Sequence, residues 1–333
     1  MKSGAAPGKG LAKMASNGTA LEGKLIVLVG GSGFFGAHLA QELLSNGARL
    51  RIASRNPERA FKLKPLAGLG QVQFARCDMT KPDSLARVVA GADAVVNLVG
   101  AFGGDLDAVQ GRGAGTLARL AKEAGAAAFV HVSAIGADAE GATAYARSKA
   151  AGEAAVLAAY PKATILRPSV LFGPDDKFIN MFAGLIAAAP VMPVFGPDAP
   201  FQPLFVDDAA LAVVAALVDA KAHGGKTYEL GGPEVLTMLE LNQRIAKAQG
   251  RSPIFLPLHD AISAAFATLT GWLPLAPLSR QQWLLLKAGN VVAPKAKGCK
   301  ALGIAPRPLG LFLDRWMVRY RKHGRFGEKT TAA

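Results

Sequence analysis

The stretch VLVGGSGFFGAHL, residues 27–39, limits what this chain can fold into more than any other part of the sequence. It joins a run of β-forming residues to a helix-like apolar pattern through Gly30, Gly33 and Gly36, spaced as G-x-x-G-x-x-G. Residues without a Cβ permit a tight turn, close approach of a pyrophosphate and close packing of helix on strand, while the helix N-terminus supplies N–H groups. Because the pattern stands at the start of an alternating series, it predicts a dinucleotide site in preference to an ordinary strand-to-helix turn.

Strand-like and helix-like segments alternate from Lys24 to about Arg167. Short apolar runs, rather than strict alternation, are typical of strands buried on both faces, which form parallel sheets covered by helices on each side. The fold class predicted is therefore α/β, a doubly wound parallel (Rossmann) sheet with a smaller C-terminal lobe. The expected strands are 25–30, 48–54, 72–78, 93–100, 128–136 and 163–170, and the expected helices are 34–45, 57–66, 82–90, 105–124 and 145–159.

The regular alternation of strand-like and helix-like segments ends after Val170, where prolines become frequent and the segments become irregular. We therefore expect three parts: a flexible N-terminal tail over 1–23, an NAD(P)-binding Rossmann domain over 24–170, and a second lobe over 171–333 that ends in a basic amphipathic tail. The first part contains no apolar run of signal-peptide length, so secretion is not predicted.

Composition limits the classes of function. Hydrophobic residues make up 51% of the 333 residues and charged residues 19%, which excludes disorder for most of the chain. Much of the formal net charge of +14 falls in residues 287–329 and indicates an acidic partner, whether anionic lipid, nucleic acid or protein. Cys77 and Cys299 have no CxxC or metal-binding spacing, so neither disulfides nor zinc are predicted and a reducing compartment is the default. Residues 261–279 approach the length of a membrane span, but glycine and proline interrupt them, so no transmembrane helix is predicted.

The ends of the second, third and fourth strands suit the adenosine half of a dinucleotide. In IASRNP, Ser54 and Arg55 stand where an NAD site places Asp or Glu, and a guanidinium there favours a 2′-phosphate. NADPH is therefore predicted in preference to NADH. Asp78 can accept a hydrogen bond from the adenine amino group or cap the following helix, and both interpretations stay open. Leu98 and Val99 belong to NLVGA, where small residues let the backbone lie against adenosine.

Tyr145 and Lys149, in the segment YARSK, are spaced i and i+4 and so share one face of a helix. A lysine in that position can lower the pKa of the tyrosine and hold the nicotinamide ribose, so that the phenol gives or takes a proton as hydride moves. The spacing alone is common by chance. Together with the glycine turn it predicts a catalytic pair.

Seven motifs spread over residues 25–212 resemble the short-chain dehydrogenase/reductase superfamily in its extended or atypical branch: GGSGFFG, CDMTKPDSL, NLVGA, HVSAIGA, YARSK, LRPSVLFGP and FQPLFVDDAA. The sequences of these motifs are most similar to those of a family of nucleotide-binding accessory subunits of respiratory complex I, found in mitochondria and some proteobacteria. The resemblance implies a tightly held, mainly structural NADPH, other complex I subunits as partners, and no established turnover. It also implies a peripheral position near the membrane arm, on the cytoplasmic face of a bacterial inner membrane or the matrix side of a mitochondrial one.

The same resemblance assigns cofactor contacts motif by motif, from the pyrophosphate and the adenosine half to the nicotinamide and its ribose, and implies no metal. The residues so implied are Gly30, Ser32, Gly33, Phe34, Phe35, Gly36, Ser54, Arg55, Asp78, Leu98, Val99, Ser133, Tyr145, Lys149, Pro168 and Val170.

One departure from the family pattern matters. Active members of the extended branch carry a hydroxyl residue just after the fifth strand to bind the substrate carbonyl, whereas here the better alignment puts Ala134 there and Ser133 one place early. A shift of one residue at a strand end reverses the direction of the side chain. If Ser133 does not reach a substrate, Tyr145 and Lys149 serve binding alone.

Two functions other than an accessory subunit are also consistent with the sequence. One is a free-standing NADPH-dependent reductase or epimerase with Tyr145 as general acid, and the other is a redox-sensing regulator that responds to the NADPH/NADP ratio.

The second half of the chain offers fewer signals. Arg167 is expected in a structural ion pair rather than as an anion clamp, and Asp207 and Asp208 as helix caps rather than catalysts. The histidines are scattered and receive no ligand role.

The C-terminal tail has an amphipathic pattern. An interfacial membrane helix and a core-docked helix with a solvated basic face both fit it, and the nearby apolar stretch favours a hydrophobic partner. Nucleic acid is not predicted as a partner, because no aromatic-interleaved basic platform is present. The residues expected to share the apolar face are Leu309, Phe312, Leu313, Trp316, Met317 and Tyr320.

Overall fold

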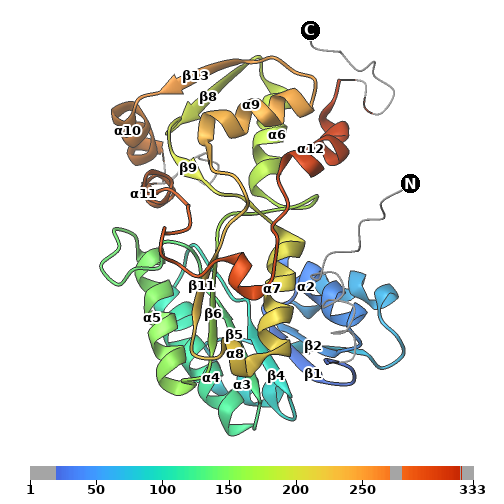
Figure 1. The fold of residues 1–333 in the computed structure, drawn as a ribbon. Helices are drawn as coiled ribbons and strands as arrows, with labels where there is room; N and C mark the ends of the chain where they lie inside the picture. Colours follow the sequence, from blue (N-terminus) through green and yellow to red (C-terminus); the bar gives the residue numbers. More distant parts are fainter. Residues whose placement is uncertain (1–19, 271–279, 323, 325–333) are drawn as a thin grey trace, which may run out of the picture.

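A parallel sheet of seven strands forms the centre of the molecule, in the order β11-β6-β5-β4-β1-β2-β3 (Figure 1). The computed structural model describes residues 20–270, 280–322 and 324. Strand order runs outward in opposite directions from β1 and β4, so their carboxyl ends form the switch point at which doubly wound sheets bind ligands. The predicted fold class is confirmed. The strands are β1 Leu25–Val29, β2 Arg49–Ser54, β3 Val72–Arg76, β4 Ala94–Asn97, β5 Ala128–Val132, β6 Thr164–Pro168 and β11 Thr227–Leu230.

Helices cover both faces of the sheet. In β1, Ile26 and Leu28 face the core under α2 (Phe34–Ser45) and α7 (Val206–Val218), whereas Val27 and Val29 face the opposite core. This burial on both sides explains the continuous apolar run in the sequence, and each fully buried side chain of this kind contributes about 1.5–3 kcal/mol. The second core lies under α3 (Pro82–Val89), α4 (Gly113–Glu123) and α5 (Ala144–Ala159).

Several elements differ from the prediction in detail. The segment Pro57–Leu66 is a 3-10 helix, η2, with Pro65 inside it, and one π-helical turn, η3 (Asp107–Arg112), precedes α4. The third, fourth and fifth strands end two or more residues earlier than expected, at Arg76, Asn97 and Val132. The residues after them form the loops at the carboxyl edge of the sheet.

The seventh strand comes from beyond residue 170, in the part of the chain that the sequence analysis placed in the second lobe. β11 pairs in parallel with β6, with Tyr228 opposite Leu166, and α7 packs against the same sheet. β11 has only four residues with alternating burial. Its local pattern therefore does not distinguish a sheet strand from one in a separate lobe.

The second lobe lies over the carboxyl edge of the sheet (Figure 1). After α11 the chain returns to the sheet beside β11 and then rises again to α12. The remaining elements are β7 Leu171–Phe172, α6 Phe178–Ala188, β8 Val191–Phe195, β9 Pro200–Phe201, β10 Leu204–Phe205, α8 Ala220–His223, β12 Leu236–Thr237, α9 Met238–Ala248, β13 Ile254–Leu258, α10 Asp260–Thr270, α11 Arg280–Ala288, η4 Cys299–Leu302, α12 Gly310–Met317 and η5 Val318–Tyr320.

The apolar face of the C-terminal tail packs into the molecule's own core. Leu313, Trp316 and Met317 are buried in the cluster that also contains Phe172 and Leu241. The tail is thus a core-docked helix, and the preference for an external hydrophobic partner on this face is not supported, because the face is already covered.

An ion pair between the buried carboxylate of Asp208 and the partly exposed Arg307 anchors the segment that leads into α12. Asp208 accepts hydrogen bonds from the Arg307 backbone N and Nε, both at 2.7 Å. The prediction that Asp207 and Asp208 cap a helix is wrong: α7 begins at Val206 after the N-cap residue Phe205, and both carboxylates bind distant partners instead. Of the predicted N-terminal tail, residues 1–19 lie outside the described residues, and Leu21 in the following turn is buried.

Candidate functional site

The glycine turn between β1 and α2 forms the floor of the site. Gly30 has φ +85°, and a Cβ there would lie 3.0 Å from the Val99 backbone N. At Gly36 a Cβ would lie 2.4 Å from the Gly31 backbone O, so α2 contacts the turn directly. At Gly33, the N-cap of α2, a Cβ would meet only the Gly30 O at 3.6 Å, and no side chain caps the helix. Gly30 and Gly36 hold the turn together, whereas Gly33 leaves space in front of uncapped N–H groups.

The side chains of the two phenylalanines of the turn pack against the protein's own core. The Phe34 and Phe35 rings are half-buried against the core of the second lobe. The Phe34 ring lies edge-on to His38 with 5.2 Å between centroids. Ser32, between the glycines, is also half-buried.

His38, one turn further along α2, joins three elements. Its Nδ1 lies 2.6 Å from Asp207 Oδ1 on α7 and its Nε2 lies 3.0 Å from Asp175 Oδ1 in the loop before α6. Burial lowers the pKa of His38, but the bonds to the two carboxylates outweigh it, so the pKa is raised above its ordinary value. The helix that opens at the glycine turn is therefore joined to α7 and to the loop before α6 through the His38 imidazole.

The carboxyl end of β2, where the sequence analysis expects the adenosine half of a dinucleotide, has a hydroxyl and a cation without partners among the described residues. The Ser54 Oγ is buried without a hydrogen-bond partner in the described part of the chain. Arg55 beside it is exposed and makes no ion pair or hydrogen bond with any described residue. β2 ends at Ser54, as predicted, and Arg55 follows it.

Asp78 follows β3 and forms a local turn. Its Oδ1 accepts hydrogen bonds from Thr80 N at 3.0 Å and Thr80 Oγ1 at 2.8 Å. These bonds lower the pKa of Asp78, as do the charges of Lys81 and Arg55. The interpretation of Asp78 as a helix cap is wrong, because Lys81 is the N-cap residue of α3.

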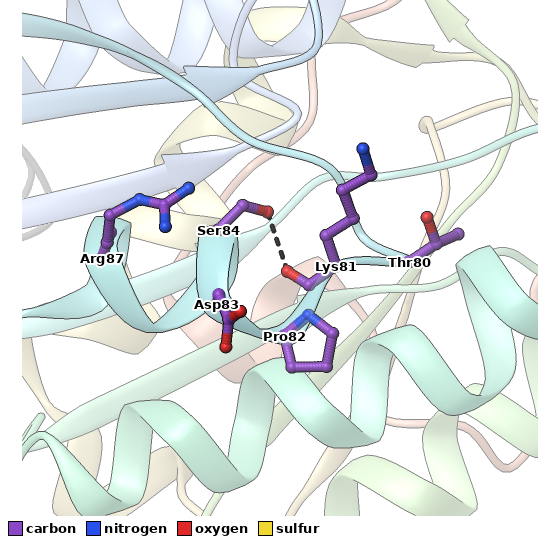
Figure 2. Close-up of a pocket in the computed structure, with 6 residues that line it drawn as sticks. All are labelled: Thr80, Lys81, Pro82, Asp83, Ser84 and Arg87. Carbon is purple, nitrogen blue, oxygen red and sulfur yellow. Dashed lines mark hydrogen bonds between the residues drawn. The ribbon is translucent and has the colours of Figure 1, made fainter.

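A surface hollow of about 360 Å³ adjoins this turn, and Figure 2 shows its lining. The Ser84 hydroxyl donates to the Lys81 backbone O at 2.8 Å and to the Asp78 O at 2.9 Å, so it closes the turn rather than facing a ligand. The hollow is lined by Thr80, Lys81, Pro82, Asp83, Ser84 and Arg87.

Tyr145 and Lys149 share one face of α5, near the carboxyl ends of β4 and β5. The Lys149 side chain is 3% exposed, and its Nζ lies 3.3 Å from the Val132 O and 3.4 Å from the Val99 O. Burial lowers the pKa of Lys149 to about 8, and the charge of Glu153 opposes this shift. Lys149 thus sits between the loops after β4 and β5, where the sequence placed the nicotinamide ribose.

The expectation that Lys149 lowers the pKa of Tyr145 is wrong. Burial raises the pKa of Tyr145 to about 12. The Lys149 Nζ lies 5.9 Å from the centroid of the tyrosine ring, and no hydrogen bond joins the two side chains. Phe102 stacks on the Tyr145 ring at 4.6 Å between centroids, which removes water from the phenol.

Ser133 is buried, and its Oγ has no partner among the described residues. It follows β5 directly, and its backbone N donates to the Leu166 O at 2.7 Å. Ala134, the next residue, is half-buried. Ser133 therefore follows Val132, whose carbonyl O contacts Lys149, at the carboxyl end of β5.

Sequence reasoning missed Gln110, which joins two parts of the site. It lies in the π-turn η3 and is buried; its Oε1 accepts from Ala101 N at 3.1 Å and its Nε2 donates to Ser148 Oγ at 2.9 Å. A Cβ on Gly152 of α5 would lie 2.1 Å from the Gln110 O, so the two backbones are in contact. The π-turn points this side chain inward, and π-turns are frequent at functional sites.

Asn290 is a second missed residue, from a distant part of the sequence. Its Oδ1 accepts from Ser169 Oγ at 2.6 Å and from Val170 N at 2.7 Å. Pro168 to Val170 is the segment implied to lie along a nicotinamide. No local pattern points to Asn290, because the contact spans more than a hundred residues.

Arg167 forms the structural ion pair that the sequence predicted. Its guanidinium binds both Glu153 oxygens, at 2.7 and 2.9 Å, and Glu229 at 3.3 Å. The Glu153 bonds raise the pKa of Arg167. This network supports α5 one turn after Lys149 and joins it to β6 and β11.

These features fit a dinucleotide. The two orphaned hydroxyls, Ser54 and Ser133, lie at the carboxyl ends of β2 and β5, and the open space at Gly33 lies at the start of α2. A dinucleotide along this edge would supply partners to both hydroxyls and a pyrophosphate to the helix N-terminus. Within the described residues, no group of three or more His, Cys, Asp or Glu side chains could hold a metal ion.

Comparison with known proteins agrees with this geometry. The model of the NAD dependent epimerase/dehydratase family matches residues 26–231. The chain is 32% identical to NADH dehydrogenase (ubiquinone) 1 alpha subcomplex subunit 9, a mitochondrial protein of Arabidopsis thaliana, over 95% of this chain and 84% of that protein. It is 31% identical to a ceramide reductase of Caulobacter vibrioides, over 74% of this chain and 78% of that one. The structure of Citrobacter sp. triphenylmethane reductase complexed with NADP(H) covers 87% of this chain and 99% of its own, with a TM-score of 0.70 and 19% identity, which indicates a shared fold.

Proposed function

This chain belongs to the NAD dependent epimerase/dehydratase family, and from that premise we propose that it is an NADPH-binding accessory subunit of respiratory complex I, the NADH:ubiquinone oxidoreductase. The observation that carries the proposal is the 32% identity to subunit 9 of an alpha subcomplex of NADH dehydrogenase (ubiquinone). That match extends over 95% of the chain and so includes the second lobe as well as the sheet. We place the subunit at the periphery of the complex, on the matrix side in mitochondria or the cytoplasmic face in bacteria.

In this role the dinucleotide mainly stabilises the fold, because a ligand bound only by the folded state adds stability by mass action. A bound nicotinamide would supply hydride chemistry, but Tyr145 is poorly suited to act as the general acid for it. Its ring is covered by Phe102, and its pKa is about 12. A general acid at neutral pH works best with a pKa near that pH.

In the described part of the chain, no helix combines the length and the apolar character needed to cross a bilayer.

A reductase is the second candidate, since Tyr145 and Lys149 share one face of α5 and a ceramide reductase is among the relatives. One experiment separates the two. Detergent-solubilised membranes of the source organism are run on a native gel, and the chain is located by mass spectrometry. We expect it in the complex I band, both in the wild type and in a Tyr145→Phe strain. Absence of the chain from that band would refute the accessory-subunit proposal. Loss of a cellular reductase activity in the Tyr145→Phe strain, with no change in the band, would favour the enzyme.

The preference for NADPH depends on Arg55. Replacing it by Glu is expected to weaken NADPH binding about 10–100-fold, because a charge-assisted contact to a phosphate contributes about 1.5–3 kcal/mol. NADH binding should stay equal or improve, since a carboxylate at this place accepts a hydrogen bond from the ribose 2′-hydroxyl. Calorimetric titration with both nucleotides measures the effect. The matched control is Arg315→Glu, an exposed arginine on α12. Equal losses for both nucleotides, or none, would show that Arg55 does not select the cofactor.

A further inference from the structure

The β3 edge of the sheet, at the opposite end from β11, carries exposed apolar side chains that the candidate nucleotide site does not use. We call it the η2 surface: the exposed apolar side chains Phe61, Leu66 and Leu69, the cations Arg59, Lys64 and Arg76, and the edge strand β3. Phe61 is 44% exposed, Leu66 53% and Leu69 fully exposed. Single exposed apolar residues are ordinary, whereas a cluster of three large ones within nine residues indicates a contact site.

The apolar cluster is anchored on β3. The Phe61 ring meets the Phe74 ring edge-on at 5.0 Å, and the Lys64 Nζ lies 3.9 Å above the Phe61 ring. η2 therefore packs on the strand rather than hanging free of it. The surface is preformed, so a partner would meet it at little cost in ordering.

Most cations of this region have no carboxylate partner among the described residues. Between Arg49 and Arg87 the sequence contains nine Lys or Arg and three Asp or Glu. Among the described residues, the ion pair from Lys62 to Asp175 at 3.8 Å is the single salt bridge that any of these nine makes. Arg59, Lys64 and Arg76 are exposed and unpaired with any described carboxylate. A surface with this unbalanced charge attracts acidic groups.

The third component is the free edge of the sheet. β3 stands at the end of the strand order and pairs only with β2 in the described structure. Edge strands present unpaired N–H and C=O groups that can add a further strand. A lipid surface could satisfy the apolar side chains and the cations but not the strand edge, and a nucleic acid backbone could satisfy the cations but not the leucines.

We propose that the η2 surface is the docking site for an acidic, extended segment of another protein. The segment pairs with the edge of β3, places carboxylates against Lys64 and Arg76, and covers Phe61, Leu66 and Leu69 with apolar side chains. The proposal goes beyond the accessory-subunit role, because it identifies the surface and the chemistry of the partner without depending on which assembly the partner belongs to.

Site-specific photocrosslinking tests it. A benzophenone side chain is placed at position 69 of the full chain, and separately at Ile254 on β13, an exposed apolar residue of the second lobe, as a matched control. Intact cells are irradiated and the crosslinked atoms are mapped by mass spectrometry. From position 69 we expect one protein segment with an excess of Asp and Glu. The double change Lys64→Glu and Arg76→Glu should reduce that crosslink at least tenfold while leaving the thermal midpoint and the product from position 254 unchanged.

Three outcomes would overturn the proposal: a crosslink to lipid, a crosslink to nucleic acid, or a protein crosslink that the charge reversal leaves unchanged. Leu69→Asp is the second variant. It leaves the cations in place and should also reduce the crosslink from a probe moved to position 66. Because the partner is mapped by its own sequence, a failure here leaves the gel test of the accessory-subunit proposal unaffected.

Discussion

Replacing Gly36 by alanine is expected to abolish dinucleotide binding, with a loss of affinity above 100-fold, and to lower the stability of the nucleotide-free protein. A Cβ at this position would lie 2.4 Å from the Gly31 O and 2.6 Å from both the C and the Cα of Gly31. These are backbone atoms of the turn, so the helix must move away from the strand to make room. Overpacking of this kind lowers the free energy of unfolding by about 1–3 kcal/mol. In the displaced helix the N-terminal N–H groups also no longer point at the pyrophosphate. Calorimetric titration with NADPH and thermal unfolding measure both effects.

Two other glycines serve as controls for Gly36→Ala. Gly33 has φ −80°, and a Cβ there would make only an ordinary contact, so Gly33→Ala should fold with nearly unchanged stability. It should still weaken NADPH binding, because the methyl group enters the space in front of the helix N-terminus. Gly184, inside α6, has open space where a Cβ would stand, and Gly184→Ala should stabilise the protein by about 0.4–1 kcal/mol. Wild-type affinity and wild-type thermal midpoint in Gly36→Ala would contradict the assigned role of the turn.

The sheet and the glycine turn could be predicted because their signals are local. Ile26 to Val29 are buried on both sides, so the strand appears as a continuous apolar run, and the turn appears as glycines at fixed spacing. The pairing of Tyr145 with Lys149 follows from helical geometry alone. Burial on both faces, spacing and periodicity are all properties of a single segment, and a sequence shows them directly.

The rest depends on contacts between distant segments. Asn290 reaches Ser169 and Val170 across the lobes, and the burial that raises the pKa of Tyr145 comes from several segments, including the loop that stacks Phe102 on its ring. The amphipathic pattern of α12 shows that one face is apolar but not what covers it, and the structure covers it with the protein's own core. Fold class therefore followed from the sequence, whereas the electrostatics of the site did not, because burial in three dimensions sets them.

Lys149→Met is expected to have opposite effects on stability and on binding. The ammonium group is buried, its hydrogen bonds among the described residues are two long ones to backbone carbonyls, and both oxygens of the nearby Glu153 bind Arg167. Because its pKa falls from 10.5 to about 8 on folding, the unfolded chain binds more protons between these values, and the stability of the nucleotide-free protein rises as pH rises from 8 to 10.5. At pH 7 the cost of burying the charge is about 3 kcal/mol.

Methionine has a similar length and no charge, so Lys149→Met should raise the free energy of unfolding of the nucleotide-free protein at pH 7 by up to about 3 kcal/mol and remove the rise between pH 8 and 10.5. NADPH affinity should fall, since the nicotinamide ribose loses its donor. Urea unfolding at four pH values and calorimetric titration give both quantities, with Lys122→Met, an exposed lysine on α4, as the matched control. Two results would contradict this account: a Lys149→Met protein that is less stable than the wild type at pH 7 without nucleotide, or one that keeps wild-type NADPH affinity. Either would mean that Lys149 serves the stability of the fold rather than nucleotide binding. The expected result would mean instead that the buried ammonium group destabilises the nucleotide-free protein and is retained because it binds the nucleotide.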